Sequence, residues 1–355
     1  MDRVLFWILG SFAVLGALDR IFGNCFGLGK EFENGLLTMG SLMLAMAGIV
    51  TLAPILAAGL RPVVIPAFKL LGADPAMFAG SILACDMGGG ALARELSQDP
   101  QAAVLGGVIT GSMLGATVVF TIPVSLGIVE EKDRPALAKG ILCGVVTIPV
   151  GVLVGGLTAG FDTAMVLRNL IPIVIIAGLL ALGLWRSEKT MIRGFTLFGQ
   201  FVVVLATLGL AAGIFGELTG LAVLPGMAPI SEGIKTVGAI AVVLSGAFPL
   251  VFLLTKLLQR PLTAAGRALG INDTAAAGLI ASLANSIAAF ALLKDMNGRG
   301  KVINVAFAVS GAFVFGDHLG FAAGFAPEFL PALIAGKLAA GASAVAIAMI
   351  LTKKD

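Results

Sequence analysis

The stretch L-A-C-D-M-G-G-G, from Leu83 to Gly90, is the segment of this chain that most strongly indicates its fold. It places the carboxylate of Asp86 in an apolar, glycine-rich segment that has no other charge between Asp74 and Arg94. An aspartate at the centre of a bilayer costs roughly 2.5–3.5 kcal/mol on insertion scales. Glycine favours a broken or closely approached backbone. Together these features predict a functional carboxylate at a broken membrane helix.

The composition sets the class of the protein. Hydrophobic residues make up 58% of the chain and charged residues 12%, and the mean hydropathy is +1.05. A soluble domain carries about 25% charged residues, so this chain cannot cover itself with a polar surface. Its apolar runs are too long for the alternating strands of a membrane β-barrel. The sequence therefore predicts an all-α polytopic membrane protein with a single transmembrane domain over residues 1–355, in contact with membrane lipid. A formal charge of +3 gives no indication of nucleic-acid binding.

Apolar runs give the number of spans, because a helix needs about 20 apolar residues to cross a bilayer. Nine stretches meet this length: Val4–Phe22, Leu36–Leu60, Ala102–Val129, Leu137–Gly160, Ala164–Trp185, Phe195–Phe215, Thr236–Leu258, Val302–Phe325 and Leu330–Leu351. Two shorter stretches, Ala76–Ala93 and Thr274–Leu293, contain polar residues. They either cross or re-enter, which gives about 9–11 transmembrane helices in all.

The two short elements share an order of features. Residues 71–80 read L-G-A-D-P-A-M-F-A-G, and residues 269–278 read L-G-I-N-D-T-A-A-A-G. Each follows a basic segment that contains proline, Arg61–Lys69 in the first case and Arg260–Arg267 in the second. This parallel indicates an internal repeat.

Shifting the alignment by one residue then places Asp86 over Asn285. The expected repeats cover roughly residues 36–129 and 236–325, with connecting helices over roughly 137–215. Transporters are often built from two inverted repeats, and their binding sites lie where the interrupted helices meet. We therefore expect an inverted repeat with two re-entrant or interrupted elements.

The distribution of basic residues orients this arrangement. The loops Arg186–Arg193 and Lys256–Arg267 each hold three basic residues and are placed in the cytoplasm. If both short elements re-enter, Lys294–Lys301 and the terminal Lys353-Lys354 also lie inside. If both elements cross, these basic groups lie outside, against the rule. The bias thus favours the re-entrant arrangement.

A second polar group stands near the end of the chain, in F-G-D-H-L-G-F. It contains Asp317 and His318, the single histidine. A histidine beside an aspartate can carry protons, or it can be an ordinary hydrogen-bonded residue near the end of a span. Asp86 could likewise have a purely structural role, at a solvated hairpin tip or in an ion pair with Arg94. Asn285 could serve only to form a hydrogen bond between packed helices.

Enzymatic and metal-binding motifs are absent from the sequence. There is no phosphate-binding G-x-x-x-x-G-K-[ST] and no H-E-x-x-H. The three cysteines form no C-x-x-C pair, so neither a disulfide framework nor a zinc site is indicated. We expect no cofactor and no enzymatic activity.

Several stretches resemble the ethanolamine-utilisation membrane transporter family. They include M-F-A-G-S-I-L-A-C-D-M-G-G, T-I-P-V-S-L-G-I-V-E, G-K-V-I-N-V-A-F-A-V-S and F-G-D-H-L-G-F-A-A. The resemblance runs in order from Glu31 to Leu351. It implies a multi-pass permease of the bacterial inner membrane that takes up ethanolamine for catabolism.

The primary amine of ethanolamine, like that of lysine, is mostly protonated at neutral pH. With this substrate, Asp86 would pair with the ammonium, Asn285 or His318 would bind the hydroxyl, and Phe315 or Phe321 would lie over the cation. The expected substrate-binding residues are Cys85, Asp86, Met87, Gly88, Asn285, Phe315, Asp317, His318 and Phe321.

Three alternatives stay open at this level. Transport proceeds either by facilitated diffusion or with protons coupled through Asp317 and His318. The same aspartates would also suit a proton or sodium antiporter, whose transport would not depend on ethanolamine. A non-transporting scaffold is disfavoured because it needs no carboxylate in lipid. Faces of small residues are compatible with a homodimer.

Overall fold

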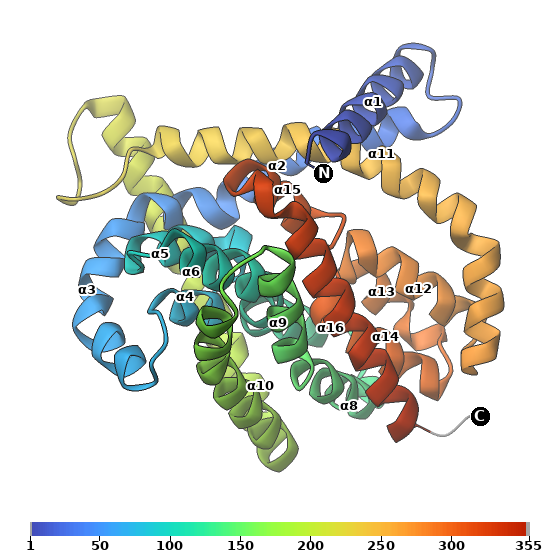
Figure 1. The fold of residues 1–355 in the computed structure, drawn as a ribbon. Coiled ribbons are helices and arrows are strands. Elements are labelled where there is room, and N and C mark those ends of the chain that lie inside the picture. The colour runs from blue at the N-terminus through green and yellow to red at the C-terminus, as the bar shows by residue number, and fades with distance from the viewer. Residues whose placement is uncertain (1, 353–355) are drawn as a thin grey trace.

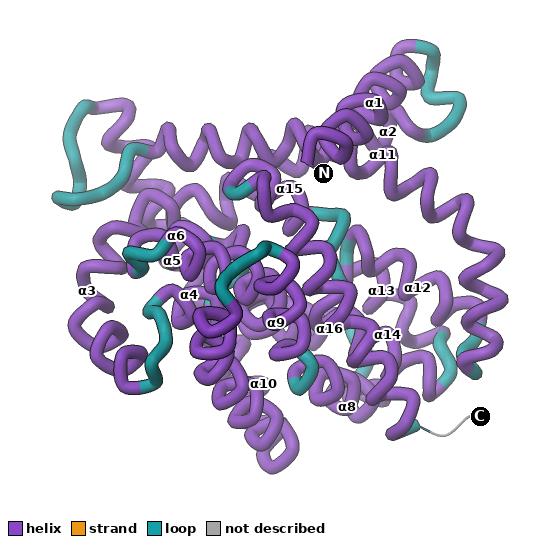
Figure 2. Tube along the Cα trace, in the orientation of Figure 1, coloured by secondary structure: helices purple, strands orange, loops and turns teal. Residues whose placement is uncertain are grey.

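The computed structural model describes residues 2–352, and the side chains of all of these except 2, 3, 188, 258–265, 267 and 268. Within this part of the chain the structure consists of helices and short connecting loops, with no strand (Figure 2). Eight described helices are long and apolar enough to cross a membrane. The predicted all-α polytopic membrane fold is confirmed.

The first part of the chain forms α1 (Asp2–Ile21), α2 (Leu28–Leu42), the π-helix η1 (Met43–Ala47), α3 (Gly48–Leu70), α4 (Ala76–Ile82), the 3-10 turn η2 (Cys85–Met87), α5 (Gly89–Leu96), α6 (Pro100–Val104), the π-helices η3 (Leu105–Gly115) and η4 (Thr117–Thr121), and α7 (Ile122–Ile128). The middle part forms η5 (Glu131–Asp133), α8 (Arg134–Val145), α9 (Ile148–Thr158) and α10 (Thr163–Thr219). The last part forms α11 (Ile230–Leu269), α12 (Asp273–Ala284), α13 (Ser286–Leu292), η6 (Leu293–Asp295), α14 (Gly298–Gly311), α15 (Asp317–Phe325), η7 (Pro327–Phe329) and α16 (Leu330–Leu351).

Two very long helices precede the two short elements. The helix formed by α2, η1 and α3 extends over 43 residues, and α11 extends over 40. Figure 1 shows α3 at the left and the far half of α11 at the right, on opposite sides of the inner helices. The expected basic segments Arg61–Lys69 and Arg260–Arg267 are not loops but belong to these helices. Three prolines inside α3, each without a backbone N–H, account for its bend.

Both short elements are interrupted helices, as predicted. The first consists of α4 and α5 around an irregular segment that contains Asp86, and the second of α12 and α13 around Asn285. Asn285 is extended, with φ −155° and ψ 125°. None of these four helices is longer than 12 residues, so none crosses a bilayer alone. Whether the elements re-enter stays a prediction.

The span expected over Val302–Phe325 is also divided. It consists of α14 and α15, and the segment between them is partly extended. In this segment the amides of Phe313 and Phe315 donate 3.0 Å hydrogen bonds to the carbonyls of Ser282 and Leu283 at the end of α12. The segment between α14 and α15 thereby provides hydrogen-bond donors for carbonyl groups at the end of α12. Such pairing is required in an apolar environment, where water cannot replace it.

The loop expected over Arg186–Arg193 is a kink inside α10. The kink lies at Ser187, with φ −147° and ψ 57°, and separates the candidate spans Thr163–Ser187 and Lys189–Thr219. The predicted orientation also used basic residues near 260–267 and Lys353-Lys354. The side chains of the former and the whole of the latter lie outside the described residues.

Candidate functional site

A cavity of about 360 Å³ lies where the interrupted helices of the two parts of the chain meet. It brings together five of the nine predicted site residues: Asp86, Met87, Asn285, Asp317 and His318. The remaining lining residues are Thr38, Ser41, Leu42, Ala45, Ala84, Phe120, Phe248, Ile287 and Phe313. These five residues, which come from distant parts of the sequence, therefore share one mainly apolar chamber.

The other four predicted residues lie around this cavity rather than in its lining. Cys85 is fully buried, with its sulfur 4.0 Å from the Oδ1 atom of Asp86. Gly88 and Phe321 line a second, smaller cavity. Phe315 is partly buried and packs against the core. The described aromatic residues that line the first cavity are Phe120, Phe248 and Phe313.

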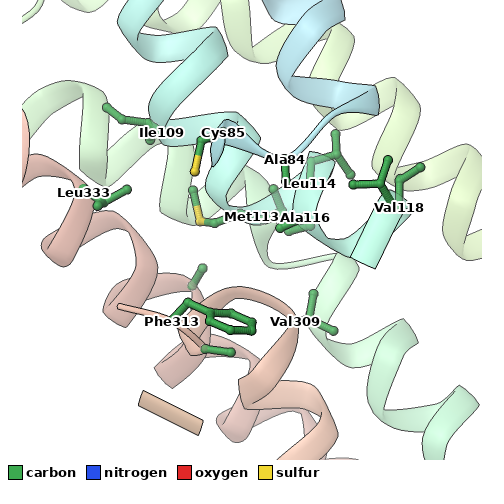
Figure 3. Packing of buried hydrophobic residues seen from close by; sticks show 14 of the residues in the cluster. Ala84, Cys85, Ile109, Met113, Leu114, Ala116, Val118, Val309, Phe313 and Leu333 are labelled. Atoms are coloured by element: carbon green, nitrogen blue, oxygen red, sulfur yellow. The ribbon is translucent and has the colours of Figure 1, made fainter. Parts of the chain in front are cut away.

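Glycines hold the Asp86 segment in its irregular shape. Gly88 has φ +93°, and a Cβ atom at this position would overlap the side chain of Ile49. Gly115 of η3 lies against the backbone of Leu83, where a Cβ atom would collide with the carbonyl oxygen. Figure 3 shows Ala84 and Cys85 packed beside η3. The glycine-rich sequence therefore allows the break to lie directly on the neighbouring helix.

Asp86 faces His318, which lies in the first turn of α15 and lines the same cavity. The Nε2 atom of His318 is 3.8 Å from the Oδ1 atom of Asp86. His318 is 4% exposed and Asp86 is 9% exposed. The ring of His318 also packs against that of Phe313, with 5.1 Å between centroids. Phe313 has a positive φ of 60°, an uncommon backbone conformation for this residue type, and it lies directly in the cavity lining.

Lys337, which the site prediction missed, completes the polar cluster. Its side chain is buried, and its Nζ atom lies 3.0 Å from the Nδ1 atom of His318. It also donates a 2.7 Å hydrogen bond to the carbonyl of Ser112 in η3. A signal was available in the sequence, because Lys337 is the one charged residue between Leu330 and Leu351. A lone charge within a span is costly and indicates a functional or paired group.

With Lys337 as an ammonium, its contact with His318 fixes the tautomer of the neutral imidazole. An ammonium group has only donors, so Lys337 as an ammonium requires the Nδ1 atom of His318 to accept. In the neutral ring the proton is then on Nε2, the atom that faces Asp86. Lys337, His318 and Asp86 thus form a row of polar groups that ends in the cavity.

A second cavity of about 150 Å³ lies further along the same elements. Leu42 and Ala45 line the first cavity, and Met46 and Val50 line the second. On α15, Asp317 and His318 line the first, while Phe321 and Phe325 line the second. The two chambers therefore follow one another along shared helices.

An aromatic stack lies beside this second cavity. The rings of Phe321 and Phe325 are stacked, with 4.8 Å between centroids. The guanidinium of Arg94 lies 3.7 Å from the centroid of the Phe325 ring and donates a 3.0 Å hydrogen bond to the Phe325 carbonyl. Arg94 is thus engaged with Phe325, in contrast to the alternative in which it pairs with Asp86.

Cys85, Asp86 and His318 have potential metal-ligand atoms within 4.8 Å of one another. The ammonium of Lys337 lies directly behind this group, 3.0 Å from the imidazole. A fixed positive charge at this distance opposes a divalent ion. The arrangement is better suited to a singly charged cation.

Comparison with known proteins identifies the family. Residues 1–351 match the family described as "Ethanolamine utilisation protein, EutH". The chain is 54% identical over 354 residues to the "Probable ethanolamine permease EutH" of Listeria monocytogenes, covering 100% of this chain and 95% of the relative. It is 45% identical to the protein of the same name from Escherichia coli, covering 100% of this chain and 96% of the relative. It is 51% identical to the "Uncharacterized protein YxeR" of Bacillus subtilis, covering 99% and 95%.

No solved structure gives a significant match to the chain. Two of the three relatives above carry the name of a permease, and none carries that of an enzyme. This agrees with the sequence expectation of a membrane transporter that is not an enzyme. With a match over nearly its full length, the chain belongs to the EutH family of ethanolamine utilisation proteins.

Proposed function

We propose that this chain carries ethanolamine, as its ammonium cation, across the inner membrane of a bacterial cell. The observation that carries the proposal is the position of Asp86: this carboxylate lies at the break of a membrane helix and lines a mainly apolar cavity. Relatives with 45% and 54% identity bear the name probable ethanolamine permease. A buried carboxylate in such a place attracts a small organic cation.

The lining of the cavity fits the chemistry of ethanolamine. Asp86 pairs with the ammonium, and the rings of Phe120, Phe248 and Phe313 offer aromatic faces to the cation. The Oδ1 atom of Asn285 accepts a 2.8 Å hydrogen bond from the Ile287 amide. Its NH2 group then remains to donate to the substrate hydroxyl. Cavities of this kind bind small molecules by a few polar groups in an apolar wall.

The internal repeat gives this site a transport mechanism. Each of the two long helices is followed by one interrupted helix, and the interruptions at Asp86 and Asn285 line the same cavity. We interpret residues 36–129 and 236–325 as inverted repeats, with residues 137–215 connecting them. In transporters of this design one repeat rocks against the other and exposes the central site alternately to each side.

A proton or sodium antiporter is the competing function. The row of polar groups Lys337–His318–Asp86 supports it, because a proton path needs titratable groups close together: Lys337 and His318 are 3.0 Å apart, and His318 and Asp86 are 3.8 Å apart. The same row of polar groups would allow ethanolamine uptake to be coupled to protons. The alternative for ethanolamine uptake is facilitated diffusion. An antiporter would move ions equally well without ethanolamine.

The test is uptake of labelled ethanolamine into proteoliposomes at pH 6 and pH 8, with and without a proton gradient. Wild type is compared with Asp86→Asn and with the matched control Asp99→Asn, which keeps a good N-cap residue on α6. Saturable uptake that is lost in Asp86→Asn and kept in the control is expected. Full uptake by Asp86→Asn would refute the role of this carboxylate. Ion flux with no ethanolamine uptake in wild type would favour the antiporter.

A further inference from the structure

Lys337 is a buried charge that the proposed binding of ethanolamine does not use. It does not line the cavity, and its Nζ atom is held by His318 and by the Ser112 carbonyl. His318 in turn faces Asp86. Lys337 therefore acts on the cavity through the imidazole and through its electric field.

Other charged groups near α16 lie towards its ends. Lys139 of α8 donates to the carbonyl of Leu351, and Arg299 of α14 donates to that of Thr352. These carbonyls are about 20 Å from Lys337 along the helix, at 1.5 Å per residue. Glu328 belongs to η7, before the helix begins. Among the described side chains, Lys337 is the ammonium group that contacts the polar cluster of the cavity.

A count of formal charges then describes the site. The cavity is lined by two carboxylates, Asp86 and Asp317. With both carboxyl groups ionised and Lys337 present as the ammonium, the formal charge of these three groups is −1. One monovalent cation neutralises it, and a second positive charge would be left unbalanced in an apolar wall, which is costly.

We propose that Lys337 is a positioning residue that sets the capacity of the cavity at one positive charge. The site thereby accepts monocationic amines and rejects diamines, even those of the same length. This inference rests on the proposed function and adds the charge class of its substrate. It assigns to Lys337 a role in specificity rather than in direct contact with the substrate.

Ethylenediamine is a matched probe for this proposal, because it differs from ethanolamine by an amine in place of the hydroxyl. At pH 6 it is mostly a dication. The experiment measures inhibition of ethanolamine uptake by ethylenediamine, and uptake of labelled ethylenediamine itself, in proteoliposomes. The proteins are wild type, Lys337→Gln, Lys337→Arg, Asp317→Asn and the double variant Lys337→Gln/Asp317→Asn.

Wild type and Lys337→Arg, at a formal charge of −1, are expected to take up ethanolamine and to reject ethylenediamine. Lys337→Gln, at −2, is expected to bind ethylenediamine at least about tenfold more tightly than wild type does, a change of ~1.4 kcal/mol. Asp317→Asn, at 0, is expected to raise the KM for ethanolamine about tenfold, which is again ~1.4 kcal/mol. The double variant returns to −1 and should regain the preference of wild type.

The outcomes separate this inference from the proposed function. Absence of ethanolamine uptake in wild type contradicts the proposed function. Uptake in wild type together with continued rejection of ethylenediamine by a folded Lys337→Gln variant contradicts the inference alone. If Lys337→Gln does not elute as a folded protein on size exclusion, Asp317→Asn decides, and an unchanged KM for ethanolamine in that variant overturns the charge count. A double variant with a higher KM for ethanolamine than either single variant also overturns the charge count.

Discussion

The Nε2 atom of His318 lies 3.8 Å from the Oδ1 atom of Asp86, although the two residues come from opposite parts of the chain. Asp86 is placed by the break between α4 and α5, and His318 by the first turn of α15. The polar cluster therefore forms only when the two interrupted regions pack together. Substitutions at either position are expected to affect both the packing of these regions and transport.

Replacement of His318 separates its structural role from a role in proton transfer. His318→Leu leaves the ammonium of Lys337 without one of its two buried partners, so we expect a destabilisation of about 1–3 kcal/mol. His318→Gln retains an oxygen that accepts and an NH2 that donates, and is expected to remain folded and to bind ethanolamine. The measurements are thermal unfolding in detergent and uptake with an imposed proton gradient.

Under proton coupling through the imidazole, His318→Gln takes up ethanolamine but no longer responds to the gradient. Under facilitated diffusion, neither wild type nor this variant responds. A wild-type melting temperature in His318→Leu would contradict the assigned contact with Lys337.

Gly88 is expected to tolerate no side chain. Its φ of +93° is strained for an L-residue, and a Cβ atom would overlap Ile49. We expect Gly88→Ala to destabilise the protein by about 1–3 kcal/mol and to abolish uptake by displacing Asp86. Gly59→Ala in α3 is the control, since nothing lies within 4 Å of its added Cβ atom. Thermal unfolding and ethanolamine uptake of both variants check this prediction. Equal melting temperatures and equal uptake in the two variants would contradict it.

Phe321 is expected to restrict movement between the two cavities. It is 1% exposed, lines the second cavity, and lies one turn after His318, which lines the first. Phe321→Ala should widen the connection, so that larger primary amines compete with ethanolamine about tenfold better than in wild type, or ~1.4 kcal/mol. Phe22→Ala, at a side chain that is 74% exposed, serves as the control. Unchanged inhibition by larger amines in Phe321→Ala would show that the route does not pass this ring.

The buried ion pair between Lys301 and Asp133 is expected to contribute to stability and not to substrate binding. The Nζ atom of Lys301 is 2.5 Å from the Oδ1 atom of Asp133, and this contact joins α14 to the segment before α8. Asp133→Asn keeps an oxygen that can accept from Lys301 but leaves this largely buried ammonium without its counter-charge, which costs up to about 3–5 kcal/mol.

Glu130→Gln is the comparison for this ion pair. Glu130 pairs with Lys132 at an exposed position, and such pairs have little effect on stability. Thermal unfolding of the two variants tests the difference. The KM for ethanolamine of the folded Asp133→Asn fraction should remain that of wild type, and a raised KM would place the pair in the binding mechanism.

Two interruptions were predictable from the sequence because their signals are local. Asp86 stands among glycines in an apolar stretch, and Asn285 aligns with it in a similar element. The break between α14 and α15 was missed, because Val302–Phe325 is apolar enough to be a continuous span. Its extended segment is stabilised by hydrogen bonds to Ser282 and Leu283, which are remote in sequence.

Local sequence patterns are enough to indicate the membrane class, the approximate spans and the polar residues that are too costly to place in lipid without a purpose. Asp86, Asp317 and His318 follow from that cost, because it depends on each residue and its immediate neighbours. Asn285 follows from its alignment with Asp86. Which groups meet depends on the three-dimensional packing of the helices. This packing brings His318 to Lys337 and places Phe313 rather than Phe315 in the cavity wall. Such contacts join distant segments, so they leave no periodic pattern in the sequence.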